Sequence, residues 1–254
     1  MLLNRAIPCL LLDKDGLYKT VQFKKPIYVG DPINAVKIYN EKEVDELMIL
    51  DITATKEKRE PNYELLKQLA SECFMPLAYG GGINKYEQAA KLFELGIEKI
   101  ALNNSAIENP NLIKEITSVY GNQSVIVSLD IKKNLWGKYT IYTMNGSKKV
   151  NDDVILLVKK IEKLGAGELL ITNIDREGTW NGYDIELTKL ISESVNIPVI
   201  ANGGCGNINH ISEAVKLGKA SAVAIGSMAV FQKKGMGVLI SFPKYDELRT
   251  VFNN

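Results

Sequence analysis

The chain has 254 residues and a formal net charge of +1, and it is 46% hydrophobic and 24% charged. This length allows one large α/β barrel or two small domains, and the near-neutral charge gives no reason to expect nucleic acid or a membrane surface as a partner. With three scattered cysteines and one histidine, we expect no disulfide framework, no metal and no cofactor, and a reduced, cytoplasmic protein. The apolar run that ends at Asp13 is too short for a secretion signal or a membrane span.

Short apolar segments recur along the chain, and most are followed by an amphipathic helical pattern. The predicted strands are residues 6–12, 47–52, 75–79, 99–102, 125–130, 168–173, 197–201 and 221–225. The predicted helices are residues 62–72, 86–95, 111–120, 153–164, 185–194 and 208–217, and Gly96, Gly165 and Gly218 stand where a left-handed residue commonly ends a helix. Eight alternating units predict a parallel sheet that closes into a single (βα)8 TIM barrel over residues 1–254.

Two segments interrupt this alternation. Residues 14–31 are basic and aromatic and are longer than a barrel turn needs, so we interpret them as a loop at the catalytic face and a candidate lid. Residues 132–150 contain an alternating stretch at 139–143, followed by the turn signal Asn145-Gly146. The second segment predicts a small β-hairpin insertion after the fifth barrel strand, on the same face.

One pattern occurs twice, at residues 75–82 and again at 197–204. In each copy an apolar strand runs into glycines and is followed by a helix, a second strand and a small polar pair, which is Asn103-Asn104 in the first copy and Gly226-Ser227 in the second. Glycine turns let the backbone approach a ligand closely, and their N–H groups can bind an anion. The repeat predicts a two-fold half-barrel duplication and a substrate with a phosphate at each end.

Polar residues stand at the carboxyl ends of the predicted strands, where active sites of such barrels lie. They are Asp51, Asn103, Asp130, Thr172 and Asn173, with Asp175 just beyond. Because histidine is nearly absent, acid–base chemistry would fall to Asp or Lys. Asp51 can equally be a cap of the following helix. Asp130 is followed by lysines and a hairpin, so we favour a catalytic role for it.

Several motifs together resemble one known family, the cyclase subunit of imidazole glycerol phosphate synthase. They are Leu-Asp-Ile-Thr-Ala at 50–54, Gly-Gly-Gly-Ile at 80–83, Asn-Asn-Ser-Ala at 103–106, Ala-Gly-Glu at 166–168, Asp-Arg-Glu-Gly-Thr at 175–179 and Gly-Tyr-Asp at 182–184. The resemblance runs from about residue 5 to residue 231. It implies a barrel that binds a glutaminase subunit at its N-terminal face and receives ammonia through its interior. The implied substrate is a ribulosyl-phosphate aminoimidazole carboxamide nucleotide with two phosphates.

The resemblance also implies roles for individual residues. Asp130 would be a catalytic aspartate and Lys19 the loop lysine. The phosphate- and substrate-binding positions would be Asp51, Gly81, Gly82, Asn103, Asn104, Thr172, Asp175, Gly178, Gly203, Gly204, Gly226 and Ser227. A charged ring that admits ammonia would consist of Arg5, Glu46, Lys99 and Glu168, whose two signs can neutralise each other. Ordinary surface charges at strand starts are the alternative interpretation of these four.

One departure bears directly on activity. The family's first catalytic aspartate falls on Leu11, which cannot transfer a proton. Asp13 could replace it only after rearrangement, because two positions along a strand span roughly 6–7 Å. The leucine run at 10–12 is similar to a divergent branch of the family encoded with surface-polysaccharide genes. In that branch the barrel and its glutaminase are implied to supply ammonia to a separate sugar amidotransferase that makes acetamidino sugars.

Three hypotheses therefore remain open. The first is an ammonia-channelling subunit with weak or no cyclase activity, which Leu11 favours. The second is a true cyclase of histidine biosynthesis, which the retained Asp130 and Lys19 favour, with Asp13 or another group supplying the missing acid. The third is a non-catalytic scaffold that binds and activates a glutaminase.

Overall fold

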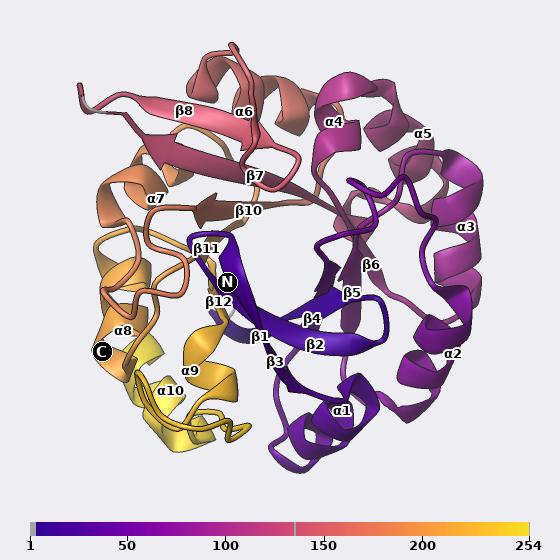
Figure 1. Cartoon of the computed structure of the whole chain (residues 1–254). Helices are drawn as coiled ribbons and strands as arrows, with labels where there is room; N and C mark the ends of the chain where they lie inside the picture. The colour runs from indigo at the N-terminus through magenta and orange to yellow at the C-terminus, as the bar shows by residue number, and fades with distance from the viewer. Residues whose placement is uncertain (1–3, 135, 254) are drawn as a thin grey trace.

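The computed structural model describes residues 4–134 and 136–253. Eight parallel strands form a closed barrel with helices around it (Figure 1). These strands are β1 (Arg5–Asp13), β4 (Leu47–Asp51), β5 (Leu77–Gly80), β6 (Lys99–Leu102), β7 (Val125–Lys133), β10 (Glu168–Asn173), β11 (Val199–Asn202) and β12 (Ala222–Ile225). Each pairs in parallel with the next, and β12 pairs with β1 to close the ring. The predicted (βα)8 barrel is confirmed.

Helices cover the outside of the barrel. They are α1 (Pro32–Glu41), α2 (Tyr63–Glu72), α3 (Tyr86–Glu94), α5 (Asn111–Tyr120), α6 (Val154–Lys163), α7 (Ile185–Ser192) and α8 (Ile208–Lys216), with the shorter α4 (Asn104–Glu108), η1 (Asn122–Ser124) and α9 (Ser227–Val230), and α10 (Tyr245–Asn253) near the end of the chain. In the described part of the chain, no helix is both long enough and apolar enough to cross a lipid bilayer.

Short polar residues fix the starts of several helices. The side chain of Asp31 accepts a hydrogen bond from Asn34 N, and Pro32 occupies the first turn of α1. Asn62 and Asp153 cap α2 and α6 in the same way. At the helix ends, Gly96 and Gly165 have the expected positive φ, but Gly218 does not, and the neighbouring Lys219 adopts the left-handed conformation instead.

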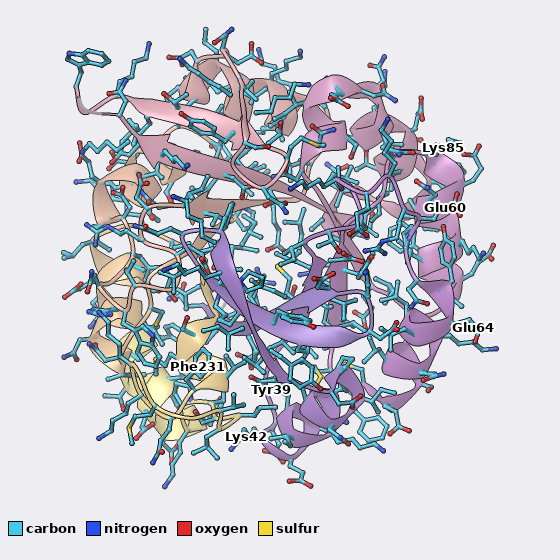
Figure 2. The ribbon with its side chains drawn as sticks, viewed as in Figure 1. Tyr39, Lys42, Glu60, Glu64, Lys85 and Phe231 are labelled. Carbon is cyan, nitrogen blue, oxygen red and sulfur yellow. The ribbon has the colours of Figure 1, made fainter. Side chains whose placement is uncertain are left out.

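Side chains on the barrel strands alternate between the interior and the surrounding helices. The interior layer is apolar and includes several small side chains. It consists of Ile7, Cys9, Met48, Ala78, Ala101, Ile126, Leu170, Ile200, Ala222 and Ala224. The larger core lies between the strands and the helices. There lies the buried Tyr39 of α1, which Figure 2 labels. Its hydroxyl donates a hydrogen bond to the carbonyl of Ala229 in α9 at 2.7 Å, which joins the first and last units of the barrel.

Two antiparallel hairpins extend from the barrel strands. Strand β2 (Gly16–Val21) pairs with both β1 and β3 (Lys24–Gly30), and β8 (Tyr139–Thr143) pairs with both β7 and β9 (Lys148–Lys149). In Figure 1 the first hairpin lies in front of the barrel strands and the second lies beside them. Residues 14–31, expected as a loop, are therefore a strand pair with a two-residue turn at Gln22 and Phe23, both at positive φ.

Candidate functional site

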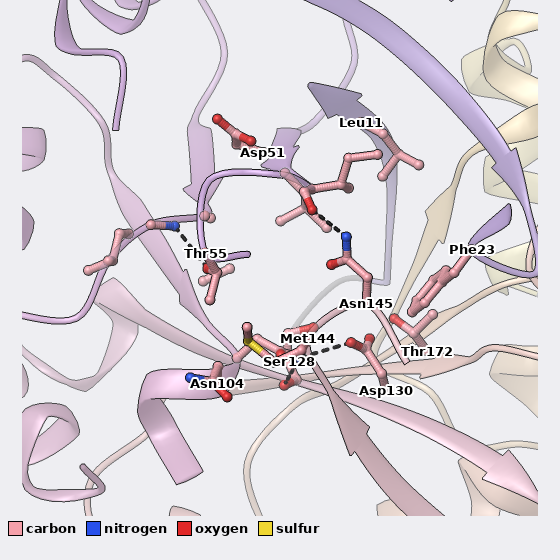
Figure 3. Close-up of a pocket in the computed structure, with 18 of the residues that line it drawn as sticks. Leu11, Phe23, Asp51, Thr55, Asn104, Ser128, Asp130, Met144, Asn145 and Thr172 are labelled. Atoms are coloured by element: carbon pink, nitrogen blue, oxygen red, sulfur yellow. Dashed lines mark hydrogen bonds between the residues drawn. The ribbon is translucent and has the colours of Figure 1, made fainter. Parts of the chain in front are cut away.

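A cavity of about 690 Å³ opens among the carboxyl ends of the barrel strands (Figure 3). Every barrel strand, or the residue that directly follows it, contributes to the lining, for example Leu11, Leu50, Gly80, Asn103, Asp130, Thr172, Asn202 and Gly226. The turn between β8 and β9 reaches across the cavity, where Asn145 Nδ2 donates a hydrogen bond to the carbonyl of Ile52 at 2.5 Å. The cavity is therefore a partly enclosed site at the face where such barrels bind ligands.

Asp130 is the carboxylate whose ionisation the cavity changes most. Its side chain is buried and accepts a hydrogen bond from Asn103 Nδ2 at 3.1 Å. Burial, assisted by the negative charge of Glu177, raises the pKa of Asp130 to about 7, although the Asn103 hydrogen bond acts in the opposite direction. A carboxyl group in this range can give or take a proton near neutral pH.

The side of the cavity formed by β1 is apolar. Leu11 lines the cavity with Leu50 and Cys9, and Figure 3 shows Leu11 and Asp130 on different sides of the cavity. Asp13, the residue considered as a replacement acid, is not among the lining residues, and its Oδ1 accepts a hydrogen bond from the Thr53 hydroxyl at 2.9 Å. The structure thus does not bring Asp13 into the cavity. Asp13 is the last residue of β1 and lies beyond Cys9 and Leu11, the residues of this strand that line the cavity.

Asp51 lines the cavity, but its hydrogen bonds organise the turn after β4. Its Oδ1 accepts from the backbone N–H groups of Thr53 at 3.0 Å and Ala54 at 2.9 Å, and Oδ2 lies 3.4 Å from Arg59 Nη1. A carboxylate with this many partners is an acceptor that fixes a turn. Asp51 therefore organises the turn after β4 and does not cap the following helix α2, whose first turn is capped by Asn62.

The first glycine turn opens directly onto the cavity. Gly81 and Gly82 have φ values of +123° and +71°, and a Cβ at these positions would lie 2.5 Å from the carbonyl of Asp51 and 2.6 Å from that of Arg59. Only glycine fits there. Asn104 and Lys58 line the same half of the cavity. The predicted residues of the first half-barrel, Gly81, Gly82, Asn103 and Asn104, are brought together.

The second glycine turn is largely outside the cavity. Thr172 and Gly226 line the cavity, but Gly178, Gly203, Gly204 and Ser227 do not. A Cβ at Gly178 would lie 2.3 Å from the carbonyl of Thr20, because β2 packs directly on this loop. Asp175 lines a smaller, separate cleft with Arg176 and Asp184. The two glycine turns therefore differ in this structure, because the first lines the cavity and Gly203 and Gly204 of the second do not.

Glu177 is a further candidate residue of the cavity, and its place there is not evident from the sequence. Its carboxylate forms a buried ion pair with Lys19 and also accepts hydrogen bonds from the Thr20 hydroxyl at 3.0 Å and from Phe23 N at 3.2 Å. Glu177 and Lys19 both line the cavity. The residue stood within the motif at 175–179, but nothing in the sequence showed that three donors of the 14–31 segment would meet it.

At the opposite end of the barrel, the four predicted ring residues meet. Arg5 Nη1 lies 2.5 Å from Glu46 Oε2 and Arg5 Nη2 lies 2.7 Å from Glu168 Oε2, while Lys99 Nζ lies 2.9 Å from Glu46 Oε2 and 2.7 Å from Glu168 Oε1. Burial acts to raise the pKa of Glu168, but Arg5 and Lys99 lower it overall. The four side chains form a closed ring of alternating charge.

The described residues contain no cluster of three or more His, Cys, Asp or Glu side chains that could hold a metal ion. The cysteines Cys9, Cys73 and Cys205 are free thiols. Burial raises the pKa of Cys9, which lines the cavity, to about 12, so this thiol stays protonated near neutral pH.

The fold and the cavity define a candidate small-molecule site of the (βα)8 barrel class, with a glycine turn and a buried carboxyl group at one end and a charged ring at the other. The sequence model of the family described as histidine biosynthesis protein matches residues 5–234. The chain belongs to this family.

Named relatives place it among imidazole glycerol phosphate synthase HisF subunits. It is 46% identical over 248 residues to a Pseudomonas aeruginosa protein with the provisional name imidazole glycerol phosphate synthase subunit hisF2, a match that covers 98% of this chain and 99% of the relative. A Vibrio vulnificus protein provisionally named subunit hisF3 is also 46% identical, with 97% and 95% covered. The Methanococcus vannielii imidazole glycerol phosphate synthase subunit HisF is 42% identical, with 92% and 93% covered.

Proposed function

We propose that this chain is an ammonia-channelling synthase subunit with weak or no cyclase activity of its own. In this proposal a glutaminase subunit binds the face that carries the charged ring, and ammonia moves through the barrel to the cavity. The final acceptor is a separate sugar amidotransferase that makes an acetamidino sugar for a surface polysaccharide. The observation that carries the proposal is Leu11 in the cavity lining, at the position of an acid, together with an intact ring at the opposite end.

The ring and the interior layer support passage of a neutral molecule. The ring residues neutralise one another, and the layer next to them is apolar, with Ala78, Ala222 and Ala224 among its members. Transfer of an ion into such a layer is far more costly than transfer of a small neutral base. The arrangement therefore favours ammonia over ammonium.

The residues that line the cavity support the proposal that cyclase activity is weak. Of the carboxyl groups that line the cavity, Asp51 organises a turn, Glu108 pairs with Lys148 and Glu177 pairs with Lys19, which leaves Asp130 for proton transfer. Leu11 and Leu50 are apolar, and Asp13 lies outside the lining and is bonded to Thr53. General acid–base catalysis contributes typically 10²–10⁴-fold to a rate. The loss of one partner would leave a slow reaction.

A true cyclase of histidine biosynthesis is the second candidate. The observation in its favour is Asp130, whose pKa of about 7 suits proton transfer, in a cavity that Lys19 also lines. In this case another group of the cavity would take the role of the missing acid.

A steady-state assay separates the two candidates. The purified chain is given the family's bisphosphate nucleotide and ammonium chloride, with the Methanococcus vannielii subunit as the reference. We expect turnover at least ~100-fold below the reference, as the loss of one acid–base group requires. Turnover at the rate of the reference would reject the proposal and establish the cyclase.

A second assay tests the passage itself. Ala222 is fully buried in the interior layer, so Ala222→Phe should fill part of that layer. With the glutaminase bound and the final acceptor present, product formation from glutamine should fall. Product formation from ammonium salt in the solution should persist, because that ammonia can reach the cavity without crossing the interior layer. Unchanged product formation from glutamine would instead support a scaffold that only activates the glutaminase.

A further inference from the structure

We propose that the turn between β8 and β9, residues 144–147, is a latch that closes part of the cavity mouth and opens to let small molecules in and out. This turn belongs to the second hairpin and contributes Met144 and Asn145 to the cavity lining. The inference goes beyond the proposed function, because it concerns access to the cavity and holds for any reaction that takes place inside it.

One hydrogen bond fastens the latch to a distant part of the barrel. Asn145 Nδ2 donates to the carbonyl of Ile52, the residue after β4, at 2.5 Å, and Figure 3 shows this bond as a dashed line at Asn145. In the sheet, β5 and β6 stand between β4 and β7, from which the second hairpin extends, so the bond spans part of the mouth. A second contact follows the turn, where Lys148 Nζ lies 3.0 Å from Glu108 Oε1. Because both of these side chains are exposed, their ion pair adds little.

The latch also rests on the first hairpin. A Cβ at Gly146 would lie 3.2 Å from Ile174 Cδ1 and 3.4 Å from Phe23 Cδ2. Phe23 lines the cavity from the turn of the first hairpin, and its N–H donates to the carboxylate of Glu177 at 3.2 Å. The two hairpins therefore meet beside the cavity, and the first one supports the latch in its closed position.

The closed latch is strained. Met144, Asn145 and Gly146 have φ values of 52°, 57° and 74°. Asparagine and glycine tolerate this left-handed region, but a long side chain such as methionine rarely adopts it. Strain of this kind persists only where the surrounding contacts hold it.

The residue before the latch carries a further cost. Thr143, the last residue of β8, is 1% exposed, and its hydroxyl has no hydrogen-bond partner among the described residues. A buried hydroxyl without a partner is unfavourable, and opening of the turn to water would relieve that cost. Strain and an unpaired hydroxyl thus oppose the bond of Asn145. Opposing contributions of this kind make a two-state element.

The base of the second hairpin is held much more firmly than the latch. Strand β8 pairs with β7 at four positions, whereas β9 has two residues. The hydroxyl of Tyr139 donates to the carboxylate of Asp184 at 3.1 Å, and Val150 N donates to the carbonyl of Ile141 at 2.9 Å. The latch can therefore move while the rest of the hairpin stays in place.

Two buried cysteines allow latch opening to be measured in the intact chain. Cys9 is 3% exposed and lines the cavity, whereas Cys205 is 4% exposed and lies outside the lining. Alkylation with iodoacetamide, a small neutral reagent, is followed for each cysteine by mass spectrometry of its peptide. Burial raises the pKa of Cys9 to about 12 and that of Cys205 to about 11, so both thiols react slowly and all variants are compared at one pH. Cys9 reports access to the cavity, and Cys205 reports wider unfolding.

Asn145→Ala removes the bond that fastens the latch. We expect Cys9 to react about fivefold faster and Cys205 to be unchanged, because the loss of one ordinary hydrogen bond shifts an equilibrium by about that factor. Asn134→Ala is the matched control, since Asn134 Oδ1 accepts from Trp136 N and Lys138 N at the other end of the hairpin, outside the cavity lining. It should change neither rate. No gain at Cys9 in Asn145→Ala, or an equal gain in both variants, would overturn the inference.

Thr143→Val should act in the opposite direction. It keeps the shape of the side chain, removes the unpaired hydroxyl and does not alter the cavity lining. The closed latch becomes more favourable, so Cys9 should react at least about twofold more slowly. General loosening of the hairpin would instead accelerate Cys9, so a rate equal to or above that of the wild type contradicts the latch.

Amide hydrogen exchange in the wild-type chain decides the matter if a variant fails to fold. Residues 144–149 should exchange at least about tenfold faster than residues 139–143, because the latch opens while β8 stays paired with β7. Equal protection of the two segments would overturn the inference. None of these measurements uses turnover, so the latch and the proposed function can fail separately.

Discussion

Arg5 and Glu168 meet at the base of the barrel, where Arg5 Nη2 lies 2.7 Å from Glu168 Oε2 although 163 residues separate them in the chain. Lys99 binds the other oxygen of the same carboxylate at 2.7 Å, and Glu46 bridges the two cations on the far side of the ring. Each charge therefore has two partners of opposite sign. Loss of any one member leaves the remaining three with unbalanced charge in a partly buried site.

Lys99→Met tests this balance. The substitution leaves Glu46 and Glu168, which are 3% and 8% exposed at their side chains, to share the single cation Arg5. Removal of one partner from a buried ion pair typically costs 3–5 kcal/mol, so we expect the free energy of unfolding in urea at pH 7 to fall by about 3 kcal/mol.

Lys219→Met is the control for this substitution. Lys219 pairs with Glu193 at an exposed site, where such pairs contribute about 0–1 kcal/mol. If the two lysine substitutions destabilise the chain equally, the ring is not a coupled charge network. The double variant Lys99→Met/Glu168→Met should recover part of the loss, because it removes one charge of each sign.

Asp130 makes stability depend on pH. Its pKa rises from 3.8 to about 7 on folding, so the folded chain holds a proton that the unfolded chain releases. The contribution is complete below about pH 4 and is lost as pH rises through 7, and a shift of about three units corresponds to about 4 kcal/mol. Urea unfolding at several pH values should show this loss in the wild-type chain.

Asp130→Asn is the comparison that isolates the effect. The amide cannot titrate, so the difference in unfolding free energy between wild type and variant should change by about 4 kcal/mol between pH 4 and 8. Other carboxyl groups, such as Glu168 with its lowered pKa, act in the opposite direction but occur in both proteins. A difference that is flat across this range would mean that Asp130 is solvated.

The barrel strands could be predicted from sequence because each is a short apolar run and most are followed by a helical period, although hairpins follow β1 and β7. The predicted strand at 168–173 coincides with β10, and the strand at 99–102 coincides with β6. The polar ends of the strands were equally predictable, since parallel strands place their carboxyl ends at one face. Asn103 and Asp130 do meet there.

The first hairpin, helix α1 and the contact between Lys19 and Glu177 could not be predicted in the same way from local patterns. The turn at Gln22 and Phe23 has φ values of 55° and 61°, a conformation that usually requires Asn or Gly, so the sequence signals no hairpin. α1 was missed as well, although Asp31-Pro32 is a helix-start signal, because the segment was interpreted as the end of a loop. The contact of Lys19 with Glu177 joins segments 158 residues apart, which no motif predicts.

Leu11→Asp tests the assignment of the missing acid. Leu11 is 9% exposed and lines the cavity, so an aspartate there can reach the ligand space. We expect cyclase turnover with ammonium chloride to rise at least ~100-fold over the parent chain, because a second acid–base group joins Asp130. The cost is a lower unfolding free energy at neutral pH, since a carboxylate replaces a nearly buried leucine.

Leu11→Asn distinguishes an effect of proton transfer on turnover from an effect of a polar side chain in the cavity. Asparagine is similar in size and polar but cannot transfer a proton, so its turnover should stay at the parent level. Equal gains in the two variants would show that hydration of the cavity, rather than proton transfer, limits the reaction. No gain with aspartate would mean that the chain lacks more of the cyclase machinery than one acid.

Two fully buried tyrosines offer the last test, because only one of them has a hydrogen-bonded hydroxyl. Tyr39 donates to the carbonyl of Ala229 at 2.7 Å, whereas the Tyr79 hydroxyl has no partner within the described residues. The Ala229 carbonyl still accepts from Ser241 N at 3.0 Å, so Tyr39→Phe removes one of its two hydrogen bonds and should cost about 0.5–1.5 kcal/mol. Tyr79→Phe removes an unpaired polar atom and should be neutral or stabilising. Urea unfolding of both variants measures the contrast, and equal losses would show that the Tyr79 hydroxyl has a partner, such as an ordered water, in solution.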